Sequence, residues 1–140
     1  MSFAEEKWDK SKIATNEDII ALFQEFKPEN EFEPGKDYSY SNTGYLLLAT
    51  IIERVSGQSF GEYLNDIVFK PLEMDDTFVY RRRYEPKKVS NYAQGYIYSD
   101  SLNRRILPDE NGKEFFYVYL DGISGDGMVN SKLHDLLNWE

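Results

Sequence analysis

The 140-residue chain contains no cysteine and only one histidine, His134. The absence of cysteine excludes disulfide bonds, thiolate metal ligands and a cysteine nucleophile. The single histidine leaves little from which to build a zinc site, so we expect neither a metal centre nor another cofactor. Leucines neighbour His134 along the chain, and we expect its side chain to be partly buried rather than a ligand or a base.

The chain also lacks a long apolar run and an excess of positive charge. No apolar stretch reaches the length that crosses a bilayer, and the first residues, MSFAEEKWDKSK, are charged rather than signal-like. The net charge of −9 argues against nucleic acid as a partner, because phosphate binding needs a basic surface. The stretch "YRRRYEPKK" interleaves bases and aromatics as single-strand binders do, but the acidic total favours a solvated loop.

Apolar and aromatic residues are plentiful. Hydrophobic residues make up 41% of the chain, with eleven tyrosines and nine phenylalanines, which is enough for a real core. The length is that of about one domain. We therefore predict a globular, mostly helical α+β chain in which 1–140 is a single domain or a fragment. It divides into a helical region over 13–75, a strand and loop region over 76–125, and a helix over 130–140.

Three helices are predicted in the first half of the chain. Thr15 and Asp18 form a capping box for "ATNEDIIALFQEF". Ser41 caps a second helix that ends at Gly57. Its predicted apolar stripe consists of Tyr45, Leu48, Ala49, Ile52 and Val55. Ser59 begins a third helix that Pro71 closes.

The second half alternates between short apolar runs and turns. "GYIYSD" and "EFFYVYL" are predicted to be strands joined by a turn at Asn111-Gly112. A glycine-rich loop follows over 122–127. A last helix, capped by Asn130 or Ser131, is expected to run to residue 140. Its apolar pattern is still continuing there, as expected of a segment cut from a longer protein.

Several landmarks then fall in a fixed order. "FEPGKDYSYSNTGYLLLATIIERVSGQSFGEYLNDIVFKPLEMDDT" has a Pro-Gly turn, a Tyr-Ser-Asn triplet, a helix ending Val-Ser-Gly and a capped helix ending Pro-Leu-x-Met. "GISGDGMVNSKLHDLLNW" adds a glycine-rich segment followed by a helix with Asp-Leu and Trp. In this order the features resemble the serine beta-lactamase and penicillin-binding protein family. That family includes class C beta-lactamases, D-alanyl-D-alanine carboxypeptidases and related esterases.

The resemblance implies a two-step acyl transfer with a serine nucleophile. Tyr40 matches the tyrosine that moves the serine proton to the leaving group, and Asn42 matches the asparagine that hydrogen-bonds the substrate amide. A free phenol has a pKa near ~10, so such a tyrosine needs nearby cations and a rigid position. The alternative is that Tyr40 is a buried tyrosine and Asn42 a cap-region amide with structural roles only.

Two of the three motifs of the family are absent from this sequence. No lysine has a serine three positions before it, and neither Lys-Thr-Gly nor His-Thr-Gly occurs. We therefore expect a segment of a larger, exported hydrolase acting on beta-lactam, peptidoglycan-type or ester substrates, and we expect the segment to be inactive alone and to self-associate. The rival hypothesis is a non-catalytic binding domain that uses a tyrosine-rich surface for a glycan or protein partner.

Overall fold

The computed structural model describes residues 2–112 and 115–139. Lys113, Glu114 and Glu140, which belong to predicted segments, lie outside the described residues. The helices are α1 (Ser2–Lys7), α2 (Asn16–Phe26), α3 (Asn42–Ser56), α4 (Phe60–Leu64), a π-helical turn (Asn65–Phe69), a 3-10 turn (Pro108–Asn111), α5 (Phe116–Tyr119) and α6 (Leu133–Leu137). The strands are β1 (Phe78–Val79), β2 (Ile97–Ser99), β3 (Arg104–Ile106) and β4 (Val129–Asn130).

The helices of the first half begin where their capping residues predict. The Thr15 side chain accepts from the Asp18 backbone N–H, and Asp18 accepts from the Thr15 backbone, which confirms the capping box of α2. Ser41 caps α3, and Gly57 ends it in the left-handed conformation, at φ 72°. Ser59 and Glu62 cap α4 reciprocally. The third predicted helix is regular only as far as Leu64, after which the chain continues as the π-helical turn.

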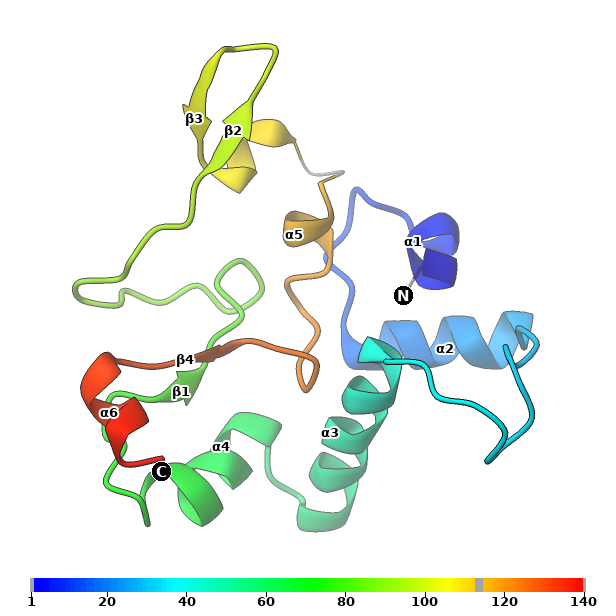
Figure 1. Cartoon of the computed structure of the whole chain (residues 1–140), viewed down its shortest axis with the longest axis horizontal. Coiled ribbons are helices and arrows are strands. Elements are labelled where there is room, and N and C mark those ends of the chain that lie inside the picture. The colour runs from blue at the N-terminus through cyan, green and yellow to red at the C-terminus, as the bar shows by residue number, and fades with distance from the viewer. Residues whose placement is uncertain (1, 113–114, 140) are drawn as a thin grey trace.

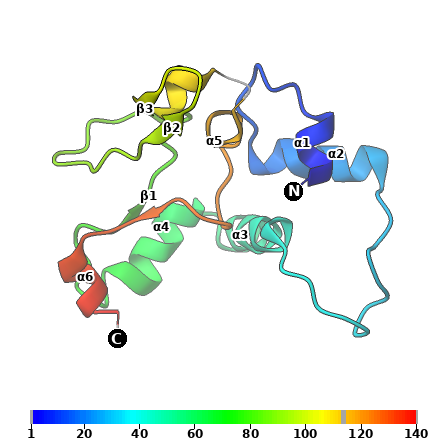
Figure 2. The same cartoon turned by 45° about the horizontal axis from the view of Figure 1, so that its top comes forward.

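The strands form two small antiparallel sheets. In one sheet, β1 pairs with β4 so that Phe78 faces Asn130. In the other, β2 pairs with β3 as a hairpin that projects away from the helices at the top of Figure 1. Helix α3 lies between α2 and α4 in both views (Figure 2). A mostly helical α+β chain is thus confirmed, because the strands are short and few in the described part of the chain.

The core lies where α2, α3 and the segment after α5 meet. Its buried members are Ala14, Ile19, Leu46, Tyr119, Leu120 and Ile123. Partly buried side chains that pack against this cluster are Trp8, Ile20, Leu22 and Phe23. Burial of these apolar side chains fixes α2 against α3, since each large side chain removed from water stabilises the fold by about 1.5–3 kcal/mol.

The predicted strand in "GYIYSD" is confirmed as β2, but the second strand and the hairpin turn were predicted wrongly. The segment predicted as the strand "EFFYVYL" contains α5 instead, and Tyr119 and Leu120 enter the core from its end. The hairpin partner of Ile97–Ser99 is Arg104–Ile106, and Asn103 makes the turn with a positive φ of 49°. Asn tolerates this left-handed conformation. Local β propensity in the aromatic run was overridden by helix packing against the core.

The predicted apolar stripe of α3 is partly wrong. Leu46, Ala49 and Thr50 are buried, whereas Leu48 and Val55 are 57% and 83% exposed. The buried face is the one that meets α2 and the glycine-rich loop. Periodicity alone identified an apolar helix but not the side of it that neighbours cover.

Helix α6 is shorter than predicted, and Lys132 rather than Asn130 or Ser131 is its N-cap residue. It is held by Asp135, whose carboxylate accepts from the Asp76 backbone N–H and the Thr77 hydroxyl, both at 2.8 Å. His134 is exposed rather than partly buried, because Asp135 turns the adjacent face toward the protein.

Candidate functional site

The first turn of α3 carries both residues singled out by the sequence. Ser41 lies between them, and its hydroxyl oxygen accepts a hydrogen bond from the Gly44 backbone N–H at 3.1 Å. This cap fixes where the extended chain before residue 42 becomes helical, so it also fixes the direction of the neighbouring side chains. Tyr40 therefore stands just before α3, and Asn42 is its first residue.

Tyr40 is a surface residue. Its side chain is 62% exposed, which excludes the alternative of a buried core tyrosine. Its ring lies 5.5 Å from the ring of Tyr45, one turn into α3. Within residues 2–112 and 115–139, no hydrogen-bond partner of the Tyr40 hydroxyl is found. The phenol is thus positioned by ring packing, and its oxygen is open to a ligand.

Asn42 is half-buried and borders two cavities. The first measures about 440 Å³ and is lined by Asn30, Glu31, Phe32, Pro34, Ser39, Tyr40, Ser41 and Asn42. The second measures about 630 Å³, and its lining includes Asn42, Tyr80, Arg82, Arg83, Tyr92, Tyr96, Asp121, Asp126, Met128 and Asn130. The structure therefore brings Tyr40 and Asn42 together at one cavity and connects Asn42 alone with the other.

The glycine-rich loop between 122 and 127 holds α3 in place. Gly125 has a φ of 102°, and a Cβ there would lie 2.5 Å from the Cβ of Ala49. Gly122 is equally confined, since a Cβ would lie 2.4 Å from the Ala14 carbonyl oxygen. No other residue type fits such close approaches without displacement of the neighbouring backbone. The loop thus passes directly over α3 and ends in the wall of the larger cavity.

Arginines in "YRRRYEPKK" are engaged within the molecule. Arg83 forms ion pairs with Asp109 at 2.6 Å and with the buried Asp121 at 3.0 Å. Arg82 lies 3.6 Å from Asp109, and Arg81 lies 2.6 Å from Glu85. The hydrogen bond from Arg83 holds the pKa of the Asp109 carboxyl below its ordinary value, because it favours the ionised form. Arg82 and Arg83 of this stretch therefore form a wall of the larger cavity and are held there by ion pairs with carboxylates.

Asp126 is a residue that the motif search missed. It lies in the glycine-rich loop, between Gly125 and Gly127, and lines the larger cavity beside Asn42. Burial raises the pKa of its carboxyl above the ordinary value. The signal in the sequence was an acidic residue between two glycines, in a segment that was predicted only as a glycine-rich loop.

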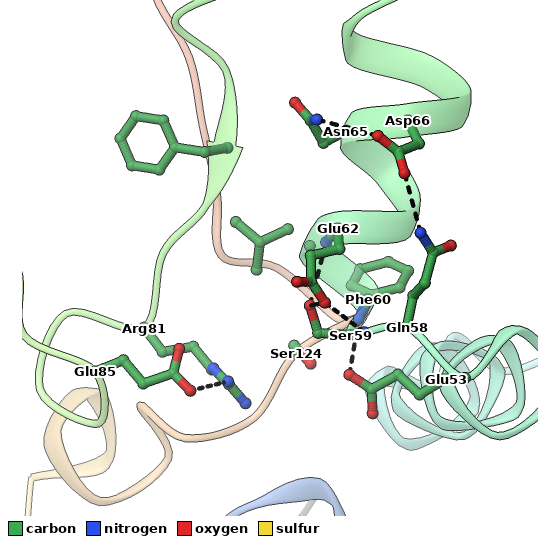
Figure 3. Close-up of a pocket in the computed structure, with 14 residues that line it drawn as sticks. Glu53, Gln58, Ser59, Phe60, Glu62, Asn65, Asp66, Arg81, Glu85 and Ser124 are labelled. Carbon is green, nitrogen blue, oxygen red and sulfur yellow. Dashed lines mark hydrogen bonds and ion pairs between the residues drawn. The ribbon is translucent and has the colours of Figure 1, made fainter.

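A third cavity, of about 690 Å³, lies between the end of α3, α4 and β1. Figure 3 shows that most of its polar side chains are paired with one another or with helix ends. Glu53 accepts from the Phe60 backbone N–H at 2.8 Å, and Gln58 donates to Asp66 at 3.0 Å. Neither Tyr40 nor Asn42 lines this cavity. Glu53 and Asp66 are thus engaged within the molecule, and we take the start of α3 as the candidate site.

In the described residues, no group of three or more side chains is arranged to hold a metal ion. No helix there is long and apolar enough to cross a membrane.

The fold places the chain in a known family of proteins. Residues 3–140 match the Beta-lactamase family, and the chain belongs to that family. It is 44% identical over 133 residues to penicillin-binding protein 4* of Bacillus subtilis, an alignment that covers 95% of this chain and 30% of that protein. It is 25% identical over 114 residues to a putative D-alanyl-D-alanine carboxypeptidase of Escherichia coli, covering 76% of this chain and 26% of that protein.

A solved structure has the same fold. The penicillin binding protein from Bacillus halodurans superposes with a TM-score of 0.73 and 25% sequence identity, covering 97% of this chain and 39% of that one. The resemblance inferred from the ordered motifs is thereby confirmed. The chain spans less than a third of the length of these curated relatives, at 30% and 26%.

Proposed function

We propose that this chain is the central helical part of a serine hydrolase that carries out two-step acyl transfer. The observation that supports this most directly is the capped start of α3. It presents the exposed phenol of Tyr40 and the amide of Asn42 at the same cavity. In this proposal the cavity is one wall of the substrate cleft, and α3 supplies the rigidity that proton transfer requires.

Each residue has a distinct task in the proposed reaction. Tyr40 takes the proton of the nucleophile and passes it to the leaving group, which requires an unblocked hydroxyl within hydrogen-bond reach. Asn42 offers both a donor and an acceptor, so one side chain can bind a substrate carbonyl or N–H and a neighbouring lysine. Neither residue forms the covalent bond: Tyr40 acts on the nucleophile that does, and Asn42 acts on the substrate and the lysine.

The proposed substrates are those of the relatives. A penicillin-binding protein and a putative D-alanyl-D-alanine carboxypeptidase are similar to this chain, which supports beta-lactams and D-alanyl peptides, with small esters as a third class. Peptidoglycan peptides lie outside the cytoplasmic membrane, so we propose that the parent protein is exported. The chain has neither Ser-x-x-Lys nor Lys-Thr-Gly, so we propose that it is inactive by itself.

The test compares this chain with a hybrid protein. In the hybrid, residues 3–140 replace the matching segment of penicillin-binding protein 4*, to which they are 44% identical. Intact-mass spectrometry after incubation with a reactive penicillin, and separately a fluorophosphonate, is expected to show one adduct on the hybrid and none on the isolated chain. Unmodified penicillin-binding protein 4* is the positive control.

Two results would contradict the proposal. A stoichiometric adduct on the isolated chain would reveal a nucleophile within these residues, and mapping that serine would replace the mechanism. A hybrid that folds by circular dichroism yet takes up neither reagent would favour the non-catalytic binding domain.

A further inference from the structure

Besides the wall that Arg82 and Arg83 form, the larger cavity beside Asn42 has three walls of different chemistry. Asn42 comes from the start of α3. Asp126 comes from the glycine-rich loop and Met128 directly follows it, whereas Tyr92 and Tyr96 come from the segment that precedes β2. At about 630 Å³ it is large enough for a peptide side chain as well as the groups that react.

The positive charges in this cavity are already matched. Arg83 is held by Asp109 and Asp121, and Arg82 lies beside the same Asp109. By contrast, the Asp126 carboxylate forms no ion pair and no hydrogen bond with another side chain among the described residues. Only its own backbone N–H stabilises the ionised form. The uncompensated charge in the cavity wall is therefore negative.

Burial makes that negative charge costly. Asp126 is half-buried, and loss of hydration raises the pKa of its carboxyl. A cation brought next to a desolvated carboxylate regains the electrostatic energy that water no longer supplies. An anionic or neutral group in the same position would not.

The aromatic wall offers a second contact for a cation. The ring of Tyr80 already has the ammonium of Lys87 at 5.2 Å from its centroid and Tyr92 edge-on at 5.8 Å. Tyr96 is 60% exposed and has no ring or cation contact among the described residues. An ammonium group over a tyrosine face is attracted by the ring quadrupole. The Lys87 contact is an example of this interaction at the neighbouring Tyr80 ring.

We propose that Asp126 and Tyr96 form a subsite that binds an aliphatic ammonium group of the substrate, within the cavity that Asn42 borders. The inference rests on the proposed function, because it assigns part of the same cleft. It makes Asp126 a specificity-determining residue. D-alanyl peptides that carry a free lysine-type side chain are preferred over those whose amino group is blocked.

The test is a binding experiment on the 140-residue chain. Nα-acetyl-lysyl-D-alanyl-D-alanine and its Nε-acetylated counterpart are titrated up to millimolar concentrations, with amide chemical shifts as the readout. The dissociation constant of the free ammonium peptide is expected to be at least about tenfold lower, a difference of about 1.4 kcal/mol. Asp126→Asn should remove this preference, and Tyr96→Leu should reduce it.

Asp75→Asn is the matched control. It changes the net charge equally, but Asp75 is exposed and lines none of the cavities described above. Its preference should equal that of the unmodified chain. Circular dichroism of each variant confirms folding.

Equal affinity for the two peptides would overturn the inference. So would a preference that survives Asp126→Asn, or failure of the chain to bind the free ammonium peptide. These outcomes are independent of the acylation test. A hybrid that reacts with penicillin while the chain shows no ammonium preference removes this subsite alone. Ammonium-selective binding with an unreactive hybrid removes the acyl-transfer function alone.

Discussion

Asn16 and Ser124 lie 108 residues apart in the chain and bind each other through two hydrogen bonds. The Asn16 amide oxygen accepts from the Ser124 backbone N–H at 2.9 Å, and the amide nitrogen donates to the Ser124 carbonyl at 3.1 Å. The same nitrogen donates to the Thr50 hydroxyl oxygen at 3.1 Å. One buried side chain at the start of α2 thus ties the glycine-rich loop to α3.

Replacing Asn16 should therefore be costly. Asn16→Ala leaves the buried Ser124 N–H and carbonyl without partners, and we expect the free energy of unfolding to fall by about 2–4 kcal/mol. Urea denaturation followed by circular dichroism measures the change. Asn30→Ala, in the exposed loop before α3, is the control and should shift stability by no more than about 0.5 kcal/mol. Equal effects of the two substitutions would contradict the role given to Asn16.

The glycine-rich loop offers a second, steric test. Gly125→Ala places a Cβ 2.5 Å from Ala49 Cβ and 2.6 Å from the Tyr45 carbonyl oxygen, at a φ of 102°. Overpacking and backbone strain together should lower the unfolding free energy by about 2–4 kcal/mol. Gly127→Ala meets no atom within 4 Å and should be nearly neutral. Thermal unfolding of the two variants measures the difference in stability. A Gly125→Ala protein as stable as the Gly127→Ala protein would show that the loop does not lie against α3.

Acid should weaken the arginine–carboxylate wall. The pKa of Asp109 is lowered by its hydrogen bond from Arg83, so the unfolded chain binds more protons than the folded chain near and below pH 3.8. The stabilisation is full above that pH and disappears as the pH falls through the folded pKa. Asp109→Asn should lower stability at neutral pH by less than about 1 kcal/mol, because the side chain is partly exposed.

This acid sensitivity is measured by urea titrations between neutral pH and pH 3. The stability difference between the unmodified chain and Asp109→Asn should shrink toward zero as the pH falls. A difference that stays constant or grows in acid would show that the Arg83 contact does not stabilise the charged form.

Tyr40 should matter only where a nucleophile is present. In the hybrid with penicillin-binding protein 4*, Tyr40→Phe removes the hydroxyl that passes the proton and should slow acylation by about 10²–10⁴-fold. Tyr38→Phe is the matched control, since Tyr38 is 83% exposed and lines neither cavity at the start of α3. Stopped-flow acylation with a chromogenic beta-lactam gives the rates. Similar rates in both variants would leave Tyr40 with a structural role only.

The uncovered face of α3 predicts self-association. Leu48, Ile51 and Val55 are 57%, 55% and 83% exposed and lie along one side of the helix. We propose that a second copy of the chain covers them, because soluble monomers rarely expose contiguous apolar patches of this kind. Light scattering at millimolar concentration should show dimers or larger assemblies, and Ile51→Lys with Val55→Lys should restore the monomer. A monomeric unmodified chain at that concentration would refute the proposal.

Local sequence determined where α2, α3 and α4 begin and where α3 ends, because a cap depends on residues within one turn of each other. Thr15 with Asp18, Ser41, Gly57, and Ser59 with Glu62 all act as predicted. The order of these landmarks also sufficed to identify the family, since each marks a fixed position in the fold. Tyr40 and Asn42 were proposed as site residues in the same way, from a motif three residues long.

Tertiary structure alone decided which surfaces are covered and which distant groups meet. The side of α3 that is buried depends on where α2 and Gly125 lie, and the change of "EFFYVYL" to helix depends on the core that Tyr119 joins. Asp126 became a candidate site residue only when the loop brought it to the cavity of Asn42. Such pairings join residues far apart in the chain, and their energy comes from burial and charge that no local pattern encodes.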